Sequence, residues 1–136
     1  LWADFDLNLA KGVYIDEPTG NKFIPLAPNI TSTGGLTVIH PMGFEGSLRY
    51  RYIGARPANE NNSVVALGYT LINARLGYKF KHATIFGNID NLTNTAWNEA
   101  QFDTESKLKF ETESVSEINF TPGNPFNVKL GIIVGF

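Results

Sequence analysis

The residues of this sequence best able to bind a ligand are acids and arginines that recur at alternate positions. Asp4 and Asp6 are two residues apart, as are Arg49 and Arg51, and side chains two apart in an extended chain share one face. Arginine binds carboxylates and phosphates through paired N–H donors, so such a face could contact an anionic substrate or neutralise carboxylates of a neighbouring domain. We favour the second role. The candidates on this face are Asp4, Asp6, Arg49, Arg51, Asn73, Arg75, Asn88 and Asp90.

A second group of candidates follows residue 96, where acids, amides and aromatic residues lie close together. Carboxylate and amide oxygens are calcium ligands, but the spacing between them does not match an EF-hand loop. We therefore predict a structural loop and no metal site. Its candidate contact residues are Trp97, Asn98, Glu99, Phe102 and Asp103.

Other kinds of chemistry find little support in the sequence. His40 and His82 share no metal-ligand spacing, and the sequence contains no cysteine, which excludes a thiolate metal site and a disulfide. The sequence has no nucleophile elbow, HExxH motif or glycine-rich phosphate loop. A net charge of -2 gives no electrostatic reason to expect nucleic acid. We predict no catalytic residue and no cofactor, so the protein is not expected to be an enzyme.

The elements that position these residues are β-strands, because apolar and polar residues alternate along most of the chain. The final segment shows the pattern clearly: Val128, Leu130, Ile132 and Val134 alternate with Lys129, Gly131 and Gly135. The predicted strands are 1–10, 35–40, 44–53, 70–80, 83–90 and 126–136. Weaker alternation at 107–111 and 117–121 predicts a further hairpin inside the last connection.

The predicted connections alternate in length. Segments 11–34, 54–69 and 91–125 are long, whereas 41–43 and 81–82 are tight turns. In an antiparallel meander all the long connections then leave one end of the sheet. Outer-membrane barrels have this arrangement, with short periplasmic turns and long extracellular loops.

The alternation does not decide which face of the sheet points outward. A soluble barrel that binds a small ligand would hide its apolar face inside, whereas a membrane barrel exposes that face to lipid. The 11 residues of 126–136 match the roughly 9–11 that a tilted strand needs to cross a bilayer. No run of 18 apolar residues occurs, so a transmembrane helix is not predicted. A requirement for detergent would separate the two alternatives.

The last strand resembles the C-terminal strand of bacterial outer-membrane proteins, which ends in an aromatic residue preceded by apolar residues at alternate positions. In that class the barrel assembly machinery recognises this strand. The matching residues are Phe136, Val134, Ile132, Leu130 and Val128.

Residues 87–97, with Asn91-Leu-Thr-Asn94 at their centre, resemble a segment near the end of TonB-dependent receptors. Trp97 departs from that pattern, since the family usually has tyrosine there. The resemblance implies an uptake receptor in the bacterial outer membrane, for a siderophore, haem, cobalamin, a metal or a glycan. It also implies that outer-membrane lipid, a plug domain, upstream strands, TonB and the barrel assembly machinery are partners. A passive porin-like barrel is the remaining alternative.

On this interpretation residues 1–136 form a partial barrel, the last six of 22 antiparallel strands, without the plug domain and TonB box. Six strands alone would leave backbone groups unpaired at two edges in hydrocarbon, where each costs several kcal/mol. Leu1 already lies inside an alternating pattern. We therefore expect the fragment not to form a stable monomeric barrel by itself.

Overall fold

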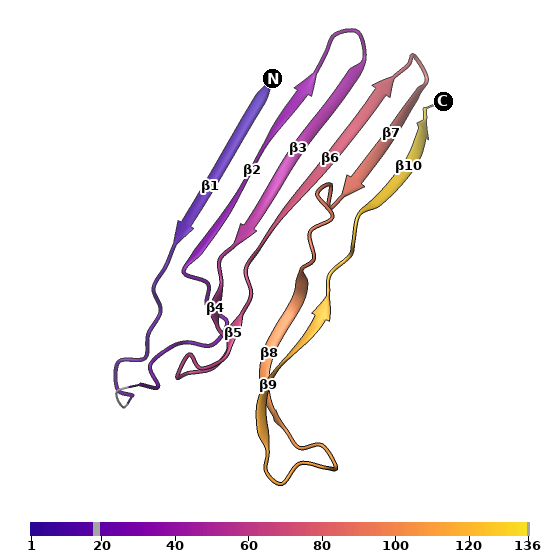
Figure 1. Cartoon of the computed structure of the whole chain (residues 1–136). Helices are drawn as coiled ribbons and strands as arrows, with labels where there is room; N and C mark the ends of the chain where they lie inside the picture. The colour runs from indigo at the N-terminus through magenta and orange to yellow at the C-terminus, as the bar shows by residue number, and fades with distance from the viewer. Residues whose placement is uncertain (18–19, 136) are drawn as a thin grey trace.

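The computed structural model describes residues 1–17 and 20–135, and every regular element among them is a β-strand (Figure 1). The strands are β1 (Trp2–Leu9), β2 (Ile30–Ile39), β3 (Phe44–Ile53), β4 (Arg56–Pro57), β5 (Val65–Ala66), β6 (Tyr69–Lys79), β7 (Ala83–Asp90), β8 (Asn98–Ser106), β9 (Val115–Pro122) and β10 (Asn127–Val134). In this described part of the chain, no helix is long and apolar enough to cross a membrane.

Six of the strands form one antiparallel sheet in the order β1-β2-β3-β6-β7-β10. Within this sheet each strand pairs with the one that precedes it along the chain, which confirms the predicted all-β meander. The remaining strands form two hairpins, β4–β5 and β8–β9, inside the long connections.

The pairing register separates polar from apolar side chains across the whole sheet. One cross-strand row joins Asp4, Gly35, Arg49 and Asn73. The next row joins Phe5, Gly34, Tyr50 and Ile72, and because of the pleat it points to the opposite side. We call these two sides the polar face and the apolar face.

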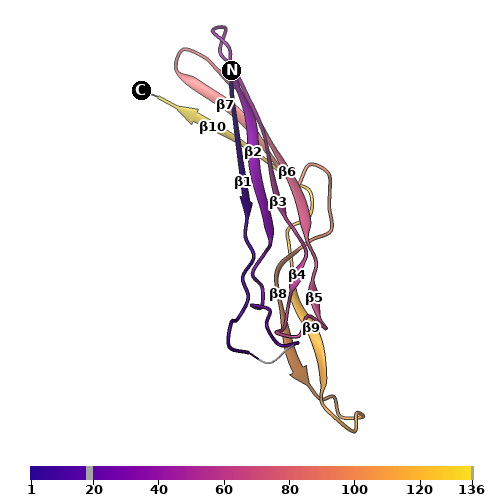
Figure 2. The same cartoon turned by 90° about the vertical axis from the view of Figure 1, so that its left-hand side faces the viewer.

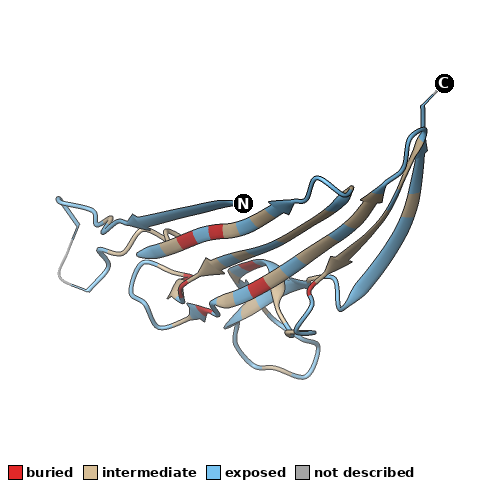
Figure 3. Ribbon diagram, turned by 90° about the horizontal axis from the view of Figure 1, so that it is seen from above, coloured by how far each residue is buried: buried red, intermediate tan, exposed pale blue. Residues whose placement is uncertain are grey.

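Among the residues that the structure describes, no second layer covers either face of the sheet (Figure 3). On the apolar face Leu36 is 51% exposed, Leu76 65% and Leu130 83%. Within the described residues the buried apolar side chains are Ala58, Ala66 and Leu71, which is far too little for a soluble core. A sheet of this kind needs lipid or another apolar layer on one side.

The two ends of the sheet carry different connections (Figures 1 and 2). Both tight turns and the C-terminal end of β10 lie at one end, and the three long connections lie at the other, as predicted. In the β2–β3 turn Gly43 adopts a φ of 96°, and its N–H donates to the carbonyl of His40 at 2.9 Å. A residue with a side chain would be strained at that φ.

Two of the predicted strand positions are wrong by more than two residues, and the short hairpin β4–β5 was not predicted. β2 begins at Ile30 instead of residue 35, because its Ser, Thr and Gly residues pair with β1 and β3 although they carry no apolar pattern. The inserted hairpin uses 98–106 and 115–122, whereas the predicted segment 107–111 lies in its turn. There the N–H of Leu108 donates to the carboxylate of Glu111 at 2.7 Å.

Candidate functional site

The register places all eight predicted polar-face candidates on the same side of the sheet. They do not form one cluster. The structure divides them into separate interactions, in which the three arginines have different partners.

Arg49 on β3 reaches across β2 to Asp4 on β1. Its two terminal nitrogens donate to the two carboxylate oxygens at 3.0 and 2.7 Å. Gly35 makes this path possible, because a Cβ there would lie 3.0 Å from Cγ of Arg49. Both side chains are about half exposed, so solvent screening keeps the contribution of the pair to stability small, but the pair neutralises the arginine.

Arg51, two residues further along β3, has no carboxylate partner of this kind, although its cross-strand row also contains an aspartate on β1. The row joins Asp6, Thr33 and Arg51, so a threonine occupies the position that Gly35 holds in the other row. Among the described residues no carboxylate lies within 4.0 Å of Arg51. Its guanidinium carbon lies 5.6 Å from the ring centroids of both Tyr69 and Trp97, within cation–π range.

Arg75 on β6 is neutralised by residues of the two neighbouring strands, β3 and β7. Its nitrogens donate to Glu45 at 3.3 Å and to Asn88 at 3.0 Å, and its guanidinium lies 4.2 Å from the ring centroid of Phe86. Lys129 on β10 pairs in the same way with Asp90 at 2.8 Å. The middle of the polar face is therefore a set of closed ion pairs.

Asn73 has a structural role that the sequence did not reveal. Its side-chain oxygen accepts a hydrogen bond from the backbone N–H of Asn91 at 2.9 Å. Asn91 has a φ of 52°, and its own amide bonds to the carbonyls of Thr95 and Asn124 at 2.9 and 3.1 Å. The Asn91–Asn94 motif is thus a turn that ties the end of β7 to the residues preceding β10.

Trp97 is fixed in the same region. Its ring N–H donates to the carbonyl of Asn124 at 2.9 Å, and its backbone carbonyl accepts from Gly123 at 2.8 Å. The indole lies 4.9 Å from the ring of Tyr69, centroid to centroid. Trp97 and Asn98 also line a hollow of about 480 Å³ next to Leu67.

The three long connections are joined to one another by hydrogen bonds. Gln101 on β8 is buried, and its amide donates to the carbonyl of Leu67 at 2.9 Å and accepts from the N–H of Leu67 at 2.8 Å. The first connection joins the second through the N–H of Phe23, which donates to the carbonyl of Glu60 at 3.0 Å. We call the joined segments 20–29, 54–68 and 96–124 the loop cluster.

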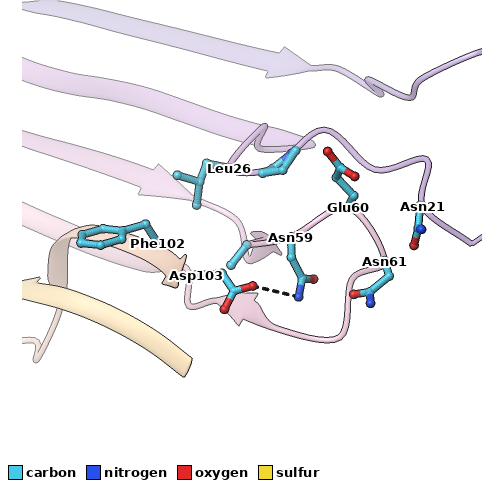
Figure 4. Close-up of a pocket in the computed structure, with 9 residues that line it drawn as sticks. Asn21, Leu26, Asn59, Glu60, Asn61, Phe102 and Asp103 are labelled. Atoms are coloured by element: carbon cyan, nitrogen blue, oxygen red, sulfur yellow. Dashed lines mark hydrogen bonds between the residues drawn. The ribbon is translucent and has the colours of Figure 1, made fainter. Parts of the chain in front are cut away.

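A pocket of about 540 Å³ lies within the loop cluster (Figure 4). Phe102 and Asp103 line it from β8, and Asn59 and Glu60 line it from the second connection. Asp103 accepts hydrogen bonds from Asn59 at 3.1 Å and from the hydroxyl of Ser116 at 2.6 Å. The carboxylate is therefore engaged within the protein.

The five loop candidates thus divide by position. Phe102 and Asp103 meet at the pocket, and Trp97 stands beside Arg51. Asn98 lines the hollow next to Leu67, and Glu99 is exposed on the hairpin. Gln101 and Asn59 were not among the predicted residues, since nothing in their local pattern distinguishes them from other loop amides. Glu45 was not predicted either, although its position in the alternation of β3 places it on the polar face.

The predicted assembly strand lies as expected for the residues that the structure describes. Val128, Leu130, Ile132 and Val134 share the apolar face and pair with β7, whereas Phe136 lies outside the described residues. Recognition of this strand by the assembly machinery stays a prediction.

Comparison with known proteins gives a consistent result. Residues 2–92 match the family model described as "TonB dependent receptor-like, beta-barrel". The structure is similar to that of the ferric yersiniabactin uptake receptor FyuA from Yersinia pestis, with a TM-score of 0.63 and 17% sequence identity. The similarity covers 96% of this chain but 20% of that receptor. No curated protein matches the sequence.

Proposed function

Since the chain belongs to the family of TonB-dependent receptor β-barrels, we propose that it forms part of the barrel wall of an outer-membrane uptake receptor. The family consists of transport receptors and not of enzymes. The observation that carries the proposal is the sheet itself, one face of which is apolar and uncovered while the other carries paired charges. Lipid would meet the first face and the barrel lumen would lie behind the second.

On this proposal the whole receptor closes a barrel of 22 strands around a plug domain and takes up a scarce nutrient with energy delivered through TonB. Six strands cannot close a barrel, since single-chain outer-membrane barrels have at least about eight. The receptor is proposed to lie in the outer membrane of a Gram-negative bacterium, with its tight turns toward the periplasm. The barrel assembly machinery would recognise β10.

The polar face and the loop cluster have separate proposed roles. The ion pairs of Arg49, Arg75 and Lys129 neutralise the wall that faces the plug. The loop cluster, with its pocket beside Phe102 and Asp103, lies at the opposite end of the sheet from the tight turns and would surround the extracellular mouth (Figures 1 and 4).

The test is uptake by cells that produce the full-length receptor, with and without functional TonB. The assay measures accumulation of labelled ferric siderophores, haem, cobalamin, metal ions and oligosaccharides. We expect accumulation of one class, lost when TonB is deleted. Equal accumulation without TonB would identify a passive pore, and a receptor absent from the outer-membrane fraction would refute the proposal.

A further inference from the structure

The two neighbouring arginines of β3 provide a comparison within one strand. Both stand on the polar face, and each has an aspartate in the same cross-strand row, two strands away. Arg49 crosses Gly35 and binds its aspartate with both nitrogens. Arg51 meets Thr33 and does not bind Asp6, so its positive charge has no carboxylate partner among the described residues.

The environment of Arg51 is already ordered around it. Tyr69 at the start of β6 and Trp97 just before β8 lie at equal distances from the guanidinium carbon. Trp97 is itself fixed by two hydrogen bonds to the segment 123–124. Aromatic neighbours hold the cation by cation–π attraction but leave its N–H donors unused.

Arg51 also has the exposure and position that a ligand contact requires. Its side chain is exposed, and it stands two residues before the end of β3, at the end of the sheet that carries the loop cluster. A planar guanidinium with free donors recognises carboxylates and other oxyanions with two parallel hydrogen bonds.

We propose that Arg51, held by Tyr69 and Trp97, selects an anionic solute by binding its carboxylate or other oxyanion group at the mouth of the barrel. This inference rests on the proposed uptake function and adds the charge class of the solute. Thr33 contributes to this binding site, since it separates Arg51 from Asp6 and keeps the guanidinium available for the solute. Arg49 and Arg75 cannot serve in this way without breaking their ion pairs.

The experiment uses cells that produce the full-length receptor and measures their uptake of paired probes. Each pair has one anionic and one uncharged member of the same chemical class. Examples are ferric citrate against an uncharged ferric trihydroxamate, and an acidic against a neutral oligosaccharide. The expected solute is the anionic member of one pair. Equilibrium binding of that probe to the purified receptor is then measured for four variants.

Arg51→Gln should weaken binding by about 10-fold to 100-fold, the usual effect of losing hydrogen bonds to a charged group. Arg51→Lys keeps the charge but loses the planar fork, so its loss should be smaller. Thr33→Gly should weaken binding as Arg51→Gln does, because it opens the path to Asp6 while the arginine is retained. Arg49→Gln is the matched control and should change binding by less than about twofold.

Three results would overturn the inference. The first is TonB-dependent uptake of the uncharged member of a pair. The second is unchanged anion binding in both Arg51→Gln and Thr33→Gly. The third is entry of large antibiotics through Arg51→Gln with unchanged binding, which would show that Arg51 holds a plug carboxylate. Uptake of no probe by a TonB-dependent route would instead refute the proposed function, and this inference with it.

Discussion

Removing the side chain of Gln101 tests whether its hydrogen bonds hold two segments of the loop cluster together. The amide of Gln101 makes two hydrogen bonds to the backbone of Leu67, at 2.8 and 2.9 Å, and thereby joins the β8–β9 hairpin to the connection between β3 and β6. Gln101 is 3% exposed, so both bonds are shielded from water. Gln101→Ala removes both at once and leaves the strand backbone of β8 unchanged.

The size of the effect follows from the two bonds. A typical intramolecular hydrogen bond contributes about 0.5–1.5 kcal/mol net, so the pair contributes about 1–3 kcal/mol to holding the connection closed. Leu67 is 65% exposed, and water can therefore reach its backbone once the amide of Gln101 is gone. We therefore expect the loss of free energy to lie in the lower half of that range. This corresponds to about a 10-fold rise in the equilibrium constant for opening of the connection.

Hydrogen exchange of the full-length receptor, followed by mass spectrometry of peptides that contain residues 64–69, measures this opening. The expected result for Gln101→Ala is about 10-fold faster exchange at the amide of Leu67, with no change in β3 or β6. Glu99→Ala is the matched control, because Glu99 lies on the same strand and is exposed. Exchange at Leu67 that stays within twofold of the unsubstituted receptor would refute the account of the loop cluster.

Two further substitutions test the packing at the loop end and the outward direction of the apolar face. Gly123→Ala would place a methyl group against the indole of Trp97, so we expect that ring to move and the thermal midpoint of the full-length receptor to fall by a few degrees; an unchanged midpoint would contradict this packing. Leu48→Arg places a charge in the middle of β3 on the apolar face, and it should destabilise the receptor in lipid by roughly 2–4 kcal/mol, measured by denaturant unfolding. Ser47→Arg, on the polar face, should cost much less, and equal costs for the two would contradict the assignment of the faces.

Most of the fold could be predicted from the sequence, because a two-residue period is a direct consequence of the pleat. The apolar alternation of β10, with Leu130 and Ile132, identified both the strand and the residues that share its apolar face. The start of β2 could not be found this way. Thr31, Thr33 and Gly34 become a strand through pairing with β1 and β3, and nothing in their local sequence requires it.

The candidate site was predicted less well, because its properties depend on what lies across the strands. Alternation placed Arg49 and Arg51 on one face but could not distinguish them. The difference arises on β2, the strand between each aspartate and its arginine, where a glycine allows one bridge and a threonine prevents the other. Gln101 was missed for a similar reason, since its hydrogen-bond partner is the backbone of Leu67, 34 residues away in the sequence.

The central claim is that the apolar face of the six-stranded sheet meets lipid and the polar face meets the lumen. Neighbouring residues Ile72 and Asn73 on β6 lie on opposite faces, and this chain contains no cysteine of its own. A spin label is attached to a single cysteine at either position in the full-length receptor in liposomes, and its collisions with oxygen and with a polar nickel complex are compared. The account predicts high oxygen and low nickel accessibility at residue 72, with oxygen accessibility much lower at residue 73. The reverse order, or equal values at both positions, would contradict it.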